Sequence, residues 1–234
     1  MKQGSLLYEG KAKKVFLTDD VHRVIQYFKD DATAFNAQKR GVIKQKGIVN
    51  QKISARLFRL LEQAGIPTHF IETLSEREML TRRVSIVPVE VVIRNQASGS
   101  LVKRLGVEEG MCLDPPLLEF FYKNDALGDP LLTEDHIRLL KLTDDQGLSE
   151  IKTLALRVND LLAPFFQERG LILVDFKLEF GWDHDMLRLA DEISPDTCRL
   201  WDVQSGERMD KDRFRKDLGR VEETYQDVLR RVCP

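Results

Sequence analysis

The 234-residue chain has little cysteine, no excess of charge of either sign and no long apolar run. Its three cysteines, Cys112, Cys198 and Cys233, form no Cys-x-x-Cys pair, which excludes a disulfide framework and a structural zinc site. Lysine and arginine number 36 against 38 acidic residues, a balance that disfavours a general nucleic-acid surface. No segment approaches the ~18 apolar residues of a membrane span, and the first residues show no signal-peptide pattern. We therefore expect a cytoplasmic protein that binds neither nucleic acid nor membrane.

Several catalytic motifs are missing as well. The four histidines form no His-Glu-x-x-His, and there is no Gly-x-Ser-x-Gly, so zinc hydrolysis and serine catalysis are disfavoured. The basic segment 39–46 has one aromatic residue nearby, Phe35, and matches no RNA-binding motif, so we do not expect it to bind RNA. What remains is a chain with 42% hydrophobic residues, enough for the core of one or two globular domains.

The periodicity of the chain predicts an α+β protein and not a regular alternation of strand and helix. Strands at 13–18 and 22–28 flank Asp19-Asp20 and predict a hairpin. The segment 30–47 has neither the periodicity of a helix nor that of a strand. Asp114-Pro115-Pro116 predicts a turn, Ser149 a helix cap, and Pro164 a kink or an early helix end. Pro88 predicts a bulge or an edge within its strand. Further helices are expected at 53–64, 101–105, 133–142, 149–169 and 210–231, and further strands at 68–72, 78–84, 85–95, 171–180 and 186–190.

The segment 171–192 carries the most informative pattern. Alternate residues of a strand face opposite sides, so Asp175, Lys177 and Glu179 share one face, and the return strand delivers Asp191. This face could simply be solvated, with weak cross-strand ion pairs. The apolar start at 171–174 instead favours burial, where clustered carboxylates need a cation. Carboxylates that converge in a cleft suit Mg²⁺, and Lys177 would then face an anionic substrate.

Two further segments have residues that can bind phosphate. A strand ends at Arg94, and the small residues that follow, Ser100 among them, lead into a short helix with free N–H groups. Near the N-terminus, Lys11 and Lys13 alternate onto one strand face, where a triphosphate could lie. Both segments also have ordinary interpretations: a capped strand-to-helix turn, and an edge strand protected by lysines. The charged cluster 202–215 is typical of a solvated helix start.

Six motifs occur in order along the chain: GKAKKVF, VPVEVVIRNQASGSLVKRLG, KNDALGDP, GLILVDFKLEFG, DEISPDTCRLWD and DKDRFR. Together they closely resemble the SAICAR synthetase (phosphoribosylaminoimidazole-succinocarboxamide synthase) family of purine biosynthesis, over essentially the whole chain. The resemblance implies ATP- and Mg²⁺-dependent ligation of L-aspartate to the carboxylate of 5-amino-1-(5-phospho-D-ribosyl)imidazole-4-carboxylate, through an acyl phosphate. The products would be SAICAR, ADP and phosphate.

The resemblance also implies an architecture. An N-terminal antiparallel β-sheet domain, 1–83, is expected to cover ATP, and a larger α/β domain, 84–234, to carry the substrate and metal sites, with the active site in the cleft between them. We expect a homo-oligomer. Two other functions stay open on the residues alone: a small-molecule kinase that stops at phosphoryl transfer, and a catalytically silent module that binds nucleotide or RNA.

Individual roles follow from the same resemblance. The residues expected along ATP are Lys11, Ala12, Lys13 and Arg82. The residues expected to hold Mg²⁺ are Glu179 and Asp191. The residues expected to orient the reacting groups as catalytic residues are Asp175 and Lys177. The residues expected to bind the imidazole substrate or aspartate are Arg94, Ser100, Arg199, Lys123, Asp129, Lys211, Arg215, Lys39 and Arg40.

Overall fold

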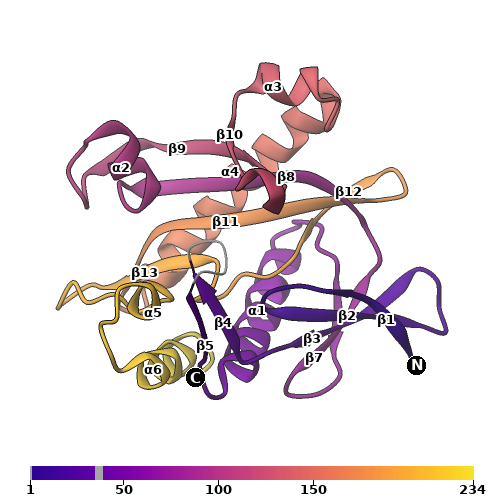
Figure 1. The fold of residues 1–234 in the computed structure, drawn as a ribbon, viewed down its shortest axis with the longest axis horizontal. Helices are drawn as coiled ribbons and strands as arrows, with labels where there is room; N and C mark the ends of the chain where they lie inside the picture. The colour runs from indigo at the N-terminus through magenta and orange to yellow at the C-terminus, as the bar shows by residue number, and fades with distance from the viewer. Residues whose placement is uncertain (1, 35–38) are drawn as a thin grey trace.

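A computed structural model describes residues 2–34 and 39–234, which form two antiparallel sheets and a separate strand pair (Figure 1). The first sheet has the order β1-β2-β3-β7-β6, the second has β10-β9-β8-β11-β12 with β13 paired to β11, and β4 pairs with β5. The strands are β1 Gln3–Glu9, β2 Lys13–Thr18, β3 Arg23–Phe28, β4 Asp31–Ala34, β5 Lys39–Val42, β6 Phe70–Thr73, β7 Glu78–Arg82, β8 Ser85–Gln96, β9 Cys112–Tyr122, β10 Leu131–Leu132, β11 Leu171–Asp183, β12 Met186–Ala190 and β13 Cys198–Asp202. The helices are α1 Lys46–Gln63, α2 Ser100–Leu105, the 3-10 turn η1 Asp125–Leu127, α3 Glu134–Leu139, α4 Asp145–Gln167, α5 Asp212–Arg215 and α6 Val221–Val232. This α+β architecture confirms the predicted fold class.

The second sheet has one apolar face and one charged face. Along β8, Val89, Val91 and Ile93 lie in the core, and they alternate with Glu90 and Arg94, which line cavities on the other side. Helix α4 covers the apolar face and contacts β8 and β11, behind which it crosses in Figure 1. The period of two along the strand thus directs charged side chains to the opposite face of the sheet.

The first sheet is covered by α1. This helix buries Ile53, Leu57, Phe58 and Leu61, and it contacts β3, β6 and β7 on one side and α6 on another. The helix ends before Gly65, which has a φ of 77°, a conformation that glycine adopts without strain. The sheet therefore has its second face free to line the cavity described below.

Several predicted elements are confirmed. Strands β2 and β3 pair as the expected hairpin, and β11 and β12 form the second one. The helix predicted at 53–64 is present, although it begins earlier, at Lys46. Opposite β11, the register of β8 shifts between Glu90 and Ile86, which is the irregularity expected around Pro88.

Other predictions are wrong for physical reasons. The prolines of the predicted turn at 114–116 lie inside β9, between its pairings through Cys112 and Leu117, where the register shifts and a missing N–H is tolerated. The N-cap of helix α4 is Asp144, whose side chain accepts a hydrogen bond from Gly147 N, and so Ser149 is not the cap. The early helix end expected at Pro164 is also wrong, since the helix continues to Gln167 and a proline near the end removes one hydrogen bond only.

The remaining differences concern the two ends of the chain. The segment 30–47, in which no periodicity was found, contains the pair β4 and β5, and its residues 35–38 lie outside the described residues. The helix predicted at 210–231 is divided into α5 and α6, and Gly219 with a φ of 69° lies between them. Among the described residues, no helix is long and apolar enough to cross a membrane.

Candidate active site

Residues of both sheets line a cavity of about 640 Å³, which we call the central cavity. Its wall includes the apolar side chains Val15, Val24, Val84 and Ile86 together with lysines and carboxylates. A smaller cavity of about 220 Å³, the arginine pocket, is lined by Arg94, Ser100, Asp175 and Arg199 among others. The two cavities adjoin, because both are lined by Glu90, Lys177, Asp196, Thr197 and Arg215.

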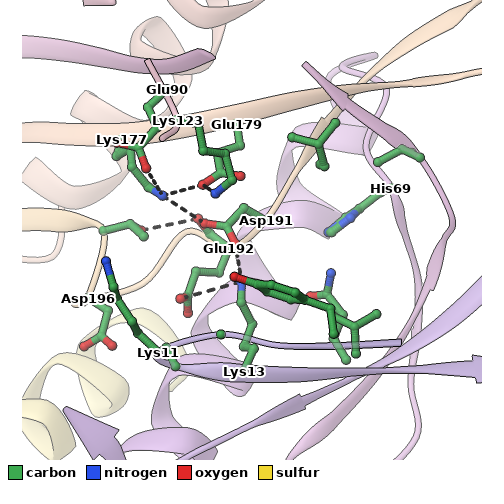
Figure 2. Close-up of a pocket in the computed structure, with 18 of the residues that line it drawn as sticks. Lys11, Lys13, His69, Glu90, Lys123, Lys177, Glu179, Asp191, Glu192 and Asp196 are labelled. Atoms are coloured by element: carbon green, nitrogen blue, oxygen red, sulfur yellow. Dashed lines mark hydrogen bonds and ion pairs between the residues drawn. The ribbon is translucent and has the colours of Figure 1, made fainter. Parts of the chain in front are cut away.

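Three lysines and two acids form the lysine–carboxylate cluster of the central cavity: Lys13, Lys123, Lys177, Glu179 and Asp191 (Figure 2). The ammonium of Lys177 lies 2.5 Å from Glu179 Oε1 and 3.4 Å from Asp191 Oδ2. Lys123 contacts Glu179 at 2.7 Å, and Lys13 donates a hydrogen bond to Asp191. The acids are thus held between cations that come from separate strands and loops.

Strand register explains how these charges meet. Between β8 and β11, Asp175 is paired with Arg94 and Glu179 with Glu90, and Lys177 bonds to Glu90 at 3.1 Å. Asp191 follows directly after β12, which returns alongside β11. A like-charged pair of acids directly across two strands repels, and the ammonium of Lys177 compensates this repulsion.

Asp191 and Lys177 keep their charges at neutral pH. Burial alone would raise the pKa of Asp191, but the charges of Lys13 and Lys177 hold it well below its usual range. Burial alone would lower the pKa of Lys177, but Glu179, Asp191 and Glu90 raise it well above its usual range. A polyanion that enters the central cavity therefore meets permanent positive charge.

The arginine pocket is organised around Asp175. Arg94 is 2% exposed, and its guanidinium donates hydrogen bonds to Asp175, to Glu119 at 2.7 Å and to Ser100 Oγ at 3.1 Å. Arg199 donates from Nη1 to both oxygens of Asp175, at 2.9 and 2.8 Å. One carboxylate thus fixes two arginines side by side, and guanidinium groups bind phosphate and carboxylate oxygens in pairs.

Residues around the pocket hold the arginines in this position. Asp212 accepts a hydrogen bond from Arg199 Nε at 3.0 Å and one from Arg215 Nη1 at 2.5 Å. Burial would raise the pKa of Asp212, but Arg199 and Arg215 lower it to about 2. A side chain at Gly99 would place its Cβ 2.5 Å from Arg199 Nη2, and its φ of 59° also favours glycine. The glycine turn before α2 thus makes room for the guanidinium.

Glu179 and Asp191 have the chemistry of a magnesium site. Among the described residues, no three His, Cys, Asp or Glu side chains converge to form a protein cage for a metal ion. Mg²⁺, however, is usually bound by one or two carboxylates together with the phosphate oxygens of a substrate. The ammonium of Lys177 contacts both carboxylates, which shows that one cation between them can touch both. The donor set therefore fits Mg²⁺.

Most residues singled out in the sequence come together at these two cavities. The central cavity is lined by Lys11, Ala12, Lys13, Arg82, Lys123, Asp129, Lys177, Glu179, Asp191, Lys211 and Arg215. The arginine pocket is lined by Arg94, Ser100, Asp175, Lys177, Arg199 and Arg215. Their individual roles stay predictions.

Lys39 and Arg40, which were also expected to bind the imidazole substrate or aspartate, line neither of these two cavities. Arg40 lines a third cavity, of about 630 Å³, which shares Lys11 with the central one. Lys39 lines none of the three cavities; its ammonium lies 2.6 Å from both Phe214 O and Asp217 Oδ1 near α5. The geometry therefore gives no support to a role of Lys39 in substrate binding.

Sequence reasoning missed several residues of the site. Glu90 could have been found, because it lies four residues before Arg94 on the same face of β8. Glu119 and Asp212 had no local signal, since they reach the pocket from β9 and α5. Gln26 and His69, which line the central cavity, are single neutral residues in an ordinary strand and loop.

Paired acids for a cation, lysines for phosphate oxygens and arginines for carboxylates meet the needs of an ATP-dependent ligase, and comparison with known proteins places the chain in that class. The SAICAR synthetase family model matches residues 6–232. The phosphoribosylaminoimidazole-succinocarboxamide synthase of Caldanaerobacter subterraneus subsp. tengcongensis is 56% identical over 232 residues, which are 99% of each chain. The chain belongs to the SAICAR synthetase family, whose members ligate aspartate with ATP in purine biosynthesis.

Solved structures of the family have the same fold. The synthase from Ehrlichia chaffeensis superposes with a TM-score of 0.95 at 48% identity, over 97% of this chain and 98% of that one. A SAICAR synthetase solved in complex with ADP superposes with a TM-score of 0.93 at 45% identity, over 97% of each chain. The likeness thus extends over nearly the whole of both folds.

Proposed function

We propose that the chain phosphorylates the carboxylate of 5-amino-1-(5-phospho-D-ribosyl)imidazole-4-carboxylate with ATP and then joins it to L-aspartate. One observation carries this proposal: Lys177 and Arg215 line both the central cavity and the arginine pocket. A nucleotide in the first cavity and a phosphorylated, carboxylated substrate in the second would therefore meet at the same side chains. The complex of a related SAICAR synthetase with ADP supports the use of ATP.

The chemistry requires two steps at one place. A carboxylate oxygen is a poor leaving group, and transfer of the γ-phosphoryl group converts it into an acyl phosphate. The amine of aspartate then attacks the carbonyl carbon, and inorganic phosphate leaves with the former carboxylate oxygen. Such a transfer depends on positioning and on charge stabilisation more than on covalent help from the protein.

The nucleotide would lie along β2. Lys11 and Lys13 would contact the phosphates, the main chain at Ala12 would pass beside them, and Arg82 would border the base. Lys13 lies in the central cavity beside Asp191, which keeps the ammonium in place until a phosphate enters. A lysine at this position supplies a compact charge for phosphate oxygens. The sheet that contains β2 would thus cover the nucleotide, and we propose a domain boundary near residue 83 on this basis.

Mg²⁺ would be held by Glu179 and Asp191, and it would neutralise charge that develops on the phosphoryl oxygens. Lys177 and Lys123 contact the same carboxylates and would move to the substrate oxygens when the metal ion is bound. The protein's own part is to hold the two carboxylates ionised and close together.

The imidazole substrate would occupy the arginine pocket. Arg94, Arg199 and Ser100 would bind its phosphate and carboxylate, and Asp175 would accept a hydrogen bond from its amino group while it holds both arginines. Aspartate must then approach from the side where the two cavities join. We assign its carboxylates to the cations Lys123, Lys211 and Arg215, which line the central cavity, and its amine to the carboxylate of Asp129 in the same wall.

Measurement of ADP release with and without aspartate tests the proposal. Enzyme, ATP, Mg²⁺ and the imidazole substrate should release ADP at a steady rate only when aspartate is added, and the product should be SAICAR. Equal ADP release without aspartate would mean a small-molecule kinase. No ADP release under any condition, with nucleotide still bound, would mean a silent binding module.

A further inference from the structure

Two polar atoms in the wall of the central cavity are buried without a partner. Neither Gln26 Oε1 nor His69 Nε2 has a hydrogen-bond partner among the described residues, and the two residues are 8% and 1% exposed. An unpaired buried polar group destabilises the folded state, so each one in a native protein calls for an explanation. Both side chains line the cavity, where a ligand can supply the missing partner.

Strand register places Gln26 about as far from Lys13 as a nucleobase lies from the phosphates of its nucleotide. Gln26 lies directly opposite Val15 on β2, and Lys13 lies two residues before Val15 on the same face of that strand. Two residues of a strand span about 7 Å, which is close to the separation of a base from the α-phosphate of a nucleotide. A triphosphate at Lys13 therefore places its base beside Val15 and Gln26.

The surroundings of Gln26 suit a flat neutral ring. Val15, Val24, Val84 and Ile86 line the same cavity and give it an apolar wall. The lysine–carboxylate cluster lines the same cavity and lies to one side of His69 in Figure 2. Ligand sites commonly have apolar walls with a few neutral hydrogen-bonding groups that fix orientation, and Gln26 is such a group.

His69 is a second neutral group at this wall, and its orientation is fixed. Its ring packs edge-on against Phe58, with the centroids 5.2 Å apart, and its main-chain oxygen accepts a hydrogen bond from Arg82 N at 2.7 Å. Its Nε2 has no partner among the described residues, and the side chain lines the cavity. A neutral imidazole has one nitrogen that donates and one that accepts.

We propose that Gln26 and His69 recognise the purine base of the nucleotide through its 6-substituted edge, and so determine nucleobase specificity. This inference rests on the proposed use of ATP. Rotation of the Gln26 amide by 180° exchanges its oxygen and nitrogen, so the side chain can accept from the 6-amino group of adenine or donate to a 6-oxo group. GTP and ITP are therefore poor probes, and the suitable probe is the triphosphate of purine riboside, which lacks any 6-substituent.

The test compares kcat/KM for ATP with kcat/KM for purine riboside triphosphate in the same enzyme. The wild-type enzyme should prefer ATP about tenfold, which corresponds to one or two hydrogen bonds. In Gln26→Leu the preference should fall to about twofold, mainly through a higher KM for ATP, and His69→Phe should lower it in the same direction. An unchanged preference in both variants would overturn the inference, although ATP-dependent SAICAR formation would still stand.

Gln51 offers a matched control. Its Oε1 is also buried without a partner among the described residues, but Gln51 lines none of the three cavities. Gln51→Leu should leave the preference for ATP at its wild-type value, whatever it does to stability. If Gln51→Leu lowered the preference as much as Gln26→Leu does, the effect would be a general loss of packing, and the inference would be wrong. Absence of ATP-dependent turnover in the wild-type enzyme would instead refute the proposed function itself.

Discussion

The arginine pocket and the lysine–carboxylate cluster hold their charged side chains in different ways. In the arginine pocket, the side chains of Arg94 and Asp175 are 3% and 4% exposed, and each bonds to more than one partner. In the lysine–carboxylate cluster, the side chains of Lys177 and Lys123 are 25% and 41% exposed and contact acids as single point charges. The guanidinium groups of the arginine pocket are thus fixed by buried partners, and we propose that the more exposed lysines exchange their acids for a substrate.

This difference agrees with what each half would bind. A phosphate or carboxylate that stays in place through the reaction suits a rigid fork of guanidinium groups. A phosphoryl group that moves from donor to acceptor suits flexible ammonium groups that follow it, together with a cation held by Glu179 and Asp191. The predictions below test this division of roles, beginning with the largest effect.

Removal of the cluster acids should have the largest effect on turnover. We expect Glu179→Gln and Asp191→Asn each to lower kcat at least about a hundredfold, because the charge that compensates Lys13 and Lys177 and holds the cation is lost. Steady-state assays across a range of Mg²⁺ concentrations measure this. Asp185→Asn, in the turn between β11 and β12 and outside the three cavities, is the control and should stay near wild-type activity. Unchanged turnover in both cluster variants would refute the magnesium assignment.

Loss of Arg94 should weaken binding of the imidazole substrate more than binding of the nucleotide. Arg94→Ala should weaken binding of the imidazole substrate about a hundredfold and binding of ADP about twofold at most. It should also lower the free energy of unfolding by about 3 kcal/mol, because the buried carboxylates of Asp175 and Glu119 each lose one of their two arginine partners. Titration calorimetry with each ligand and urea unfolding measure the two effects.

Arg104 is the matched control for this substitution. It also contacts Glu119, but it lines none of the three cavities. Arg104→Ala should therefore leave the affinity for the imidazole substrate almost unchanged. A larger effect of Arg94→Ala on ADP than on the imidazole substrate would contradict the assignment of the arginine pocket.

Acid should destabilise the protein through His69. Its pKa is lowered to about 3 in the folded chain, and it returns to about 6.5 in the unfolded chain. Between these values the unfolded state binds a proton that the folded state does not, so the free energy of unfolding decreases as the pH falls through this window. Between pH 7 and pH 5 this contribution is about 2 kcal/mol, and His69→Phe should remove it. Urea unfolding at both pH values measures it; an equal pH dependence in the variant would contradict it.

Lys11 should show the smallest effect. Its side chain and that of its partner Asp125 are 46% and 70% exposed, and exposed ion pairs contribute about 1 kcal/mol or less to stability. Lys11→Ala should therefore leave the urea midpoint nearly unchanged and raise the KM for ATP by a few fold. Lys13→Ala should raise it more, because Lys13 lies inside the cavity. The reverse order would show that the phosphates do not lie along β2 as proposed.

Part of the site could be predicted from the sequence because it depends on local geometry. The shared face of Asp175, Lys177 and Glu179 follows from the alternation of side chains in any strand, whatever its neighbours are. The turn after Arg94 was recognised from small residues before a short helix. The assignment of roles, however, came from the resemblance to a family, because a charged strand face alone also fits a solvated surface.

The rest depends on contacts between distant segments. Glu119 reaches Arg94 only because β9 pairs with β8, and the prolines in β9 conceal that strand from sequence reasoning. Asp212 reaches Arg199 from α5, a four-residue helix whose charges look like a solvated surface. The position of Gln26 in the cavity wall depends on its pairing with Val15 of β2, and the sequence of one strand alone does not reveal this pairing.

The central claim is that phosphate and carboxylate chemistry meet at the junction of the two cavities. The most direct test follows a carboxylate oxygen of the imidazole substrate into the inorganic phosphate. The imidazole substrate is labelled with ¹⁸O in its carboxylate and converted with ATP and aspartate, and the inorganic phosphate is analysed by mass spectrometry. An acyl phosphate requires one labelled oxygen to leave with the phosphate, and we expect that label in each phosphate formed. Phosphate without label, formed together with SAICAR, would contradict the account.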